Sequence, residues 1–112
     1  MLSLAQDQTE IVRVADIVAA ETSLKSQSTR ALAQNTSLSV SSSKQQVVAI
    51  ITKSGKKVNA KQLGLSKDAK IDESLKTAIS TNQYDEVANQ ILITKLKNYR
   101  DKLKTSYDAV SA

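Results

Sequence analysis

The residues of this sequence that could do chemistry are serines, lysines and paired carboxylates. Ser41-Ser42-Ser43 offers hydroxyl nucleophiles, but a serine needs an activating base, and the chain has no His and no Cys. Lys44 is the remaining choice, and nothing singles it out. Asp72-Glu73 and Asp85-Glu86 are adjacent pairs, whose side chains diverge on a helix and have no partner acid, base or ligand nearby. We therefore predict that the protein is not an enzyme and has no metal or cofactor.

A possible phosphate-binding loop, Lys53-Ser54-Gly55-Lys56, also has a simpler interpretation. A loop of this kind carries a further glycine upstream of the glycine that precedes its Lys, and Gly55 is the first glycine of the chain. We interpret the motif as the basic tip of a β-hairpin.

Positive charge is concentrated between Lys53 and Lys70. This segment has one acid, Asp68, and a net charge of +5, which equals the net charge of the whole chain. A basic patch attracts nucleic acid, anionic lipid or an acidic protein face. The segment has no Arg and no aromatic residue, which argues against base reading and strand stacking. We predict a solvated assembly surface, with polyanion binding as the alternative. The six lysines are Lys53, Lys56, Lys57, Lys61, Lys67 and Lys70.

The elements that position these residues follow from the periodicity. Residues 1–33 predict an amphipathic N-terminal helix, because apolar residues recur at threes, fours and sevens. Its stripe is formed by Leu4, Ile11, Val14 and Val18. Residues 34–45 are rich in Ser, Asn and Thr and predict a polar linker. Residues 46–61 hold two short runs around Ser-Gly and predict a hairpin.

Two further helices are predicted toward the C-terminus. Residues 66–79 form a short helix, for which Ser66 is a suitable N-cap. Residues 81–111 form the strongest helix in the sequence, and its apolar stripe continues nearly to the chain end. The side chains of this stripe include Leu92, Leu96, Tyr99, Leu103, Tyr107 and Val110. Because chain ends fray unless they are held, we expect this helix to dock on a partner.

Together these elements predict a single domain of residues 1–112 that is mainly α. Two long terminal helices pack together, with a short middle helix and a small β-hairpin. Phe, Trp and Pro are absent and aromatic residues make up 3% of the chain, so the core lacks the large side chains that dominate burial. No apolar run approaches the length of a transmembrane helix, and the N-terminus has no secretory signal pattern.

The C-terminal run KNYRDKLKTSYDAV (97–110) has a recognisable order: an Arg, a polar residue, Lys-Leu, and then a Tyr and an aliphatic residue. These places are held by Arg100, Asp101, Lys102, Leu103, Tyr107 and Val110. The run resembles the closing helix of the flagellar hook-basal-body adaptor that joins the rod to the membrane ring. The composition is similar to that of the axial proteins of bacterial type III export systems. The resemblance implies an exported subunit that polymerises through its terminal helices and has no enzymatic activity.

We accordingly expect a structural subunit of a helical or ring-shaped assembly, such as a secretion rod or a phage virion part. Its partners are other copies of itself and neighbouring structural proteins, and its place is the cell envelope, the cell exterior or a virion. The stripes of the two terminal helices are the expected interface. The alternative is a small cytoplasmic module that binds nucleic acid or another polyanion through the six lysines.

Overall fold

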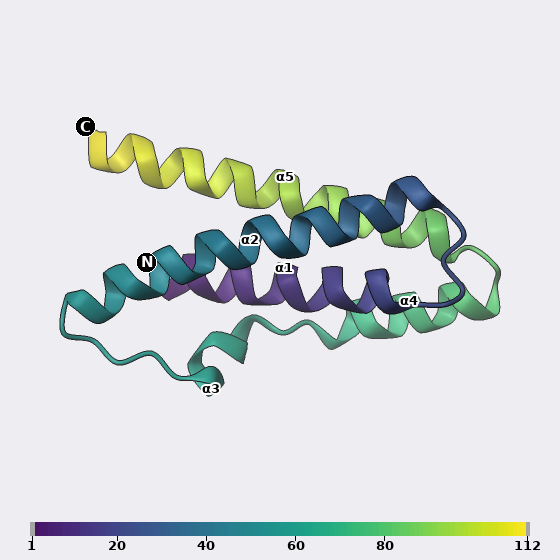
Figure 1. The fold of residues 1–112 in the computed structure, drawn as a ribbon, viewed down its shortest axis with the longest axis horizontal. Coiled ribbons are helices and arrows are strands. Elements are labelled where there is room, and N and C mark those ends of the chain that lie inside the picture. Colours follow the sequence, from purple (N-terminus) through teal and green to yellow (C-terminus); the bar gives the residue numbers. More distant parts are fainter. Residues whose placement is uncertain (1, 112) are drawn as a thin grey trace.

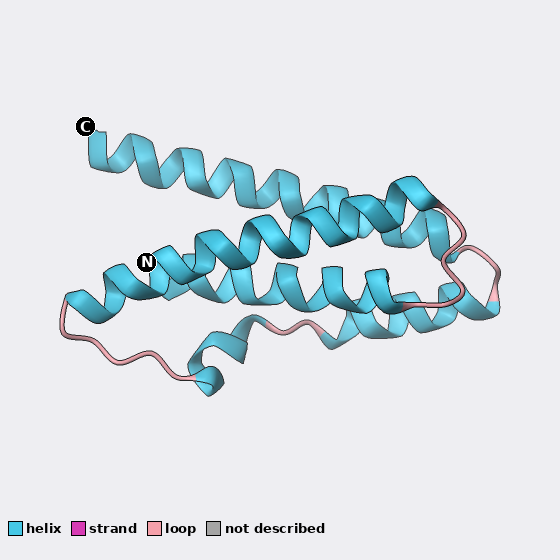
Figure 2. Cartoon of the chain, in the orientation of Figure 1, coloured by secondary structure: helices cyan, strands magenta, loops and turns pink. Residues whose placement is uncertain are grey.

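A computed structural model describes the backbone of residues 2–111 and the side chains of residues 2–105, and every regular element in it is helical (Figure 2). The elements are α1 (Leu2–Ala20), α2 (Gln27–Lys53), α3 (Ala60–Leu63), the 3-10 turn η1 (Gly64–Ser66), α4 (Ala69–Ser80) and α5 (Tyr84–Ser111). The mainly α class is confirmed. The long helices run along an elongated molecule of 47 × 28 × 21 Å (Figure 1). None of those described is long and apolar enough to cross a membrane.

The predicted N-terminal helix of residues 1–33 is too long, because the chain turns back between α1 and α2. Ser26 caps the second helix: its Oγ accepts a hydrogen bond of 3.2 Å from the Thr29 amide. The Arg30 guanidinium reaches back from α2 and donates to three carbonyl oxygens, one in the last turn of α1 and two in the turn that follows. These carbonyls belong to Ala19, Glu21 and Leu24. α1 and α2 therefore form an antiparallel pair.

The linker predicted for residues 34–45 and the hairpin predicted for residues 46–61 are both wrong. α2 continues through the linker and through the first expected strand, because it buries a stripe of side chains at helical spacing. The stripe consists of Ala33, Thr36, Val40, Val47 and Ile51. Burial against other helices outweighs the modest helix propensity of Ser, Thr and the β-branched residues. Gly55, with φ at +89°, ends the helix, and its amide donates to the Thr52 carbonyl at 3.0 Å.

The chain then crosses to the other side of α1 through a loop, α3 and η1. Asn59 and Gln62 form a capping box at α3, with side chain to amide hydrogen bonds of 2.8 and 3.2 Å. α4 covers most of the short helix predicted for residues 66–79, although its N-cap is Asp68 and not Ser66. α5 covers most of the range predicted for residues 81–111. In place of the second expected strand there is a loop and the beginning of α3.

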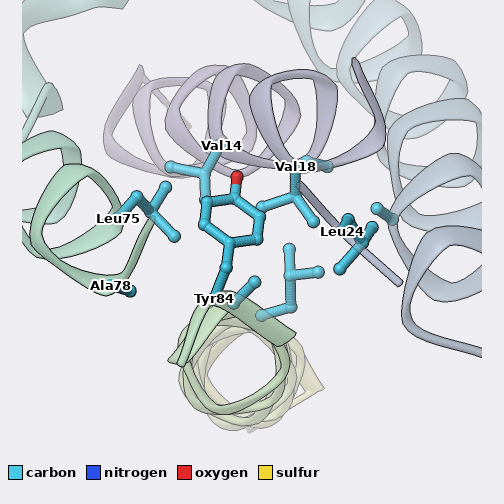
Figure 3. Close-up of a cluster of buried hydrophobic side chains, with 10 residues drawn as sticks. Val14, Val18, Leu24, Leu75, Ala78 and Tyr84 are labelled. Atoms are coloured by element: carbon cyan, nitrogen blue, oxygen red, sulfur yellow. The ribbon is translucent and has the colours of Figure 1, made fainter. Parts of the chain in front are cut away.

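The core consists of two clusters along α1. In the larger one, the Tyr84 ring from the start of α5 lies among Val14, Val18 and Leu75 (Figure 3). The smaller cluster joins Leu4 and Ala5 of α1 to Val47 and Ile51 of α2, and Tyr99 of α5 packs against it. Both terminal helices, α1 and α5, take part in both clusters, and α1 packs against α2 as well as against α5.

Candidate interaction surfaces

Five of the ten side chains predicted for the assembly interface lie inside the core of this chain. They are at most 8% exposed: Leu4, Ile11, Val14, Val18 and Leu92. Leu96 and Tyr99 are half-buried, whereas Leu103 is 39% exposed. Tyr107 and Val110 lie outside the described side chains. Because α2 and α5 cover α1, the stripe of α1 is core and not a surface for another subunit.

Polar contacts fix the position of α5 against the start of α1. Gln8 Nε2 donates a hydrogen bond of 2.7 Å to the Tyr99 hydroxyl. One turn further along α5, Lys102 Nζ donates to Asp7 Oδ2 at 2.6 Å and to Ser3 Oγ at 2.5 Å. Since α1 begins just before Ser3, α5 continues from Leu103 for about 13 Å past the last of these contacts. The axes of α5 and α2 diverge toward this end (Figure 1).

Arg13 joins α1 to the beginning of α4. Its guanidinium donates to both carboxylate oxygens of Glu10, at 2.6 and 2.9 Å, and to both of Asp72, at 2.8 and 3.0 Å. Glu10 also accepts a hydrogen bond of 2.9 Å from the Asp68 amide. Burial raises the pKa of Glu10, but these hydrogen bonds outweigh it, so its pKa lies below the ordinary value. This network of hydrogen bonds positions α4 against α1. In the described part of the chain, no group of side chains is found that could bind a metal ion.

The six lysines of the predicted basic patch all lie on one connection, from the end of α2 to the first turn of α4. We call residues 53–70 the lysine segment. All six side chains are exposed, and none forms an ion pair with a described residue. Asp68 Oδ1 accepts a hydrogen bond of 2.9 Å from the Lys70 amide, which engages the single acid of the segment in capping α4. The positive charge of this surface is therefore not neutralised within the described chain.

Sequence reasoning missed the residues that organise these surfaces. Glu10 and Arg13 are three residues apart on a helix, which is a spacing that favours an ion pair. Their partner Asp72 is 59 residues away from Arg13, and no local pattern connects them. The burial of Gln8 had no signal either, because a polar residue on an amphipathic helix is expected to face solvent.

Comparison of the chain with models of protein families, with curated proteins and with solved structures found no match. The function must therefore be inferred from surfaces of the molecule. Two stand out: the C-terminal end of α5, which continues past α1, and the lysine segment.

Proposed function

We propose that this chain is a non-enzymatic structural subunit of a helical or ring-shaped protein assembly, such as a secretion or flagellar rod or a phage virion. The last turns of α5 contact the neighbouring subunit. The observation that carries the proposal is the continuation of α5 beyond the start of α1, with Leu103 exposed on it. The stripe of α1, expected at the same interface, is instead occupied within the chain.

The exposed fraction of the side chains increases along the stripe of α5 toward its C-terminal end, where α5 continues past the start of α1. Leu92 is fully buried, Leu96 and Tyr99 are half-buried, and Leu103 is 39% exposed. In the sequence the apolar stripe continues to residue 110. It therefore extends beyond the part of α5 that packs against α1. An apolar stripe that continues past its own core is typical of a surface that packs on a second molecule.

Charge supports a contact between unlike ends of two copies. Lys97, Arg100 and Lys104 flank the stripe and are exposed, against the one exposed acid Asp101, which pairs with Arg100. Two such ends, each with a positive net charge, would repel each other. The opposite end of the molecule, where α1 joins α2 and α4 joins α5 (Figure 1), is less basic, because Glu21, Asp85 and Glu86 balance Lys25, Arg30 and Lys76 there. A contact between unlike ends is heterologous, and repeated heterologous contacts form rings or open helical filaments.

Sedimentation velocity tests the proposal on the wild type and on two matched variants. Leu103→Asp places a charge on the exposed part of the stripe, and we expect it to weaken self-association at least about tenfold, the effect of 1.4 kcal/mol. Leu38→Asp makes the same change at a side chain of α2 that is 72% exposed, and we expect no effect. A wild type that stays monomeric at high concentration contradicts the proposal, as do equal effects of the two variants.

A further inference from the structure

We infer that the lysine segment is a docking surface for an anionic membrane. Its lysines bind phospholipid headgroups, and Leu65 inserts between the lipids. The inference concerns a surface other than the end of α5 and does not depend on the proposed assembly.

Three carboxylates beside the segment already have partners within the chain, and the exposed Glu73 is the one nearby acid without a hydrogen bond or ion pair to a described residue. Glu10 and Asp72 are held by Arg13, and Asp68 caps α4. The connection that carries the six lysines runs along one edge of the molecule, beside the α1–α2 pair (Figure 1), and all six side chains are exposed. A row of lysines on one edge suits an extended anionic surface, because each ammonium group acts as a point charge that needs no fixed geometry.

An exposed leucine among these lysines favours a membrane over nucleic acid or an acidic protein as the partner. Leu65 lies on η1, between Lys61 and Lys67, and is 70% exposed. Its apolar neighbours Val58 and Leu63 instead pack against the smaller core cluster. An exposed leucine within a basic segment has no use at a phosphate backbone in water, whereas it gains free energy by entering the apolar part of a bilayer.

The way α3 and η1 are attached explains why Leu65 stays at the surface. Gln6 Nε2 of α1 donates a hydrogen bond of 2.9 Å to the carbonyl oxygen of Gln62, and the capping box at Asn59 holds the single turn of α3 together. The backbone on one side of Leu65 is therefore fixed to α1, and its side chain is presented outward.

The composition of the segment argues against nucleic acid as the partner. The segment lacks Arg and aromatic residues, which nucleic-acid surfaces use to read bases and to stack on them.

Co-sedimentation with lipid vesicles tests the inference. We expect the wild type to bind vesicles of equal parts phosphatidylcholine and phosphatidylserine, to bind much less to phosphatidylcholine alone, and to be released by salt. Replacing Lys56, Lys57 and Lys61 by Gln should weaken binding about 100-fold. Each lysine near the membrane surface raises the binding constant about fivefold. Leu65→Ser should weaken binding about tenfold.

The matched control replaces three exposed lysines outside the segment, Lys25, Lys76 and Lys97, by Gln and changes the net charge equally. We expect it to retain most of the vesicle binding. An equal loss in this control would overturn the inference, because net charge alone would then explain the binding. Duplex DNA is the second probe: tight binding to DNA that Leu65→Ser leaves unchanged, with no binding to the anionic vesicles, would assign the segment to nucleic acid instead.

Discussion

The hydroxyl of Tyr99 and the side-chain amide of Gln8 form a hydrogen bond of 2.7 Å that joins α5 to α1. Gln8 is completely buried, and its Oε1 has no hydrogen-bond partner in the structure. The hydrogen bond to Tyr99 therefore offsets the free-energy cost of burying this amide. Because the two residues are 91 positions apart, the bond also fixes the register of the two terminal helices.

Replacing Tyr99 by Phe leaves the buried amide of Gln8 without its partner, and we expect the free energy of unfolding to fall by about 1–3 kcal/mol. Adding Gln8→Met removes the amide as well, so the double variant should recover most of the lost stability. Urea unfolding of the wild type, both single variants and the double variant gives the coupling energy of the pair. Additive effects would show that the two side chains do not interact.

Glu10 makes the fold sensitive to acid. Its pKa is lowered in the folded state, so it stabilises the fold above the unfolded value of about 4.5 and loses this effect as the pH falls through its folded pKa. We expect the stability of the wild type to decrease from neutral pH to below 4.5. Glu10→Gln has no titratable group there and should show a smaller decrease in urea unfolding. An identical pH dependence in both proteins would contradict the role of Glu10.

Tyr84 makes the fold sensitive to alkali. Burial, reinforced by the nearby Glu21, raises its pKa to about 12. The neutral phenol therefore stabilises the fold below the unfolded pKa of 10.0, and this effect is lost as the pH rises through 12. Tyr84→Phe should remove this part of the alkaline destabilisation. Its hydroxyl has no partner in the structure, so the variant should be as stable as the wild type at neutral pH, or about 1 kcal/mol more stable. Thermal unfolding at neutral and alkaline pH measures both effects.

Ser42 tests whether residues 34–45 form a helix or a linker. The residue is exposed in the middle of α2, so Ser42→Pro should lower the free energy of unfolding by about 3 kcal/mol, because it removes a helical hydrogen bond and clashes with the preceding turn. Ser42→Ala should be neutral or stabilise by a few tenths of a kcal/mol, about the difference in helix propensity. In a linker the two substitutions would have similar, small effects on the urea unfolding midpoint.

The sequence alone was sufficient for the helices whose periodic pattern is long and uninterrupted. The steps of three and four from Leu92 to Leu103 predict α5, and the stripe from Leu4 to Val18 predicts α1. It also located the charge of the lysine segment, because lysines without nearby acids stay exposed in almost any fold. These features depend on local spacing and on the cost of burying charge.

Only the tertiary structure decided how residues 34–53 fold and which apolar stripes are core. The Ser-rich and β-branched residues of α2 have weak local preferences, so burial of Val40, Val47 and Ile51 against neighbouring helices sets their conformation. An amphipathic pattern indicates that one face of a helix is buried, but it does not identify the segment that covers this face. The turn between α1 and α2 brings α2 onto α1 and so makes the stripe of α1 core. Likewise Leu103 is exposed because α5 continues past its contacts with Ser3 and Asp7 of α1, which the apolar spacing of α5 does not reveal.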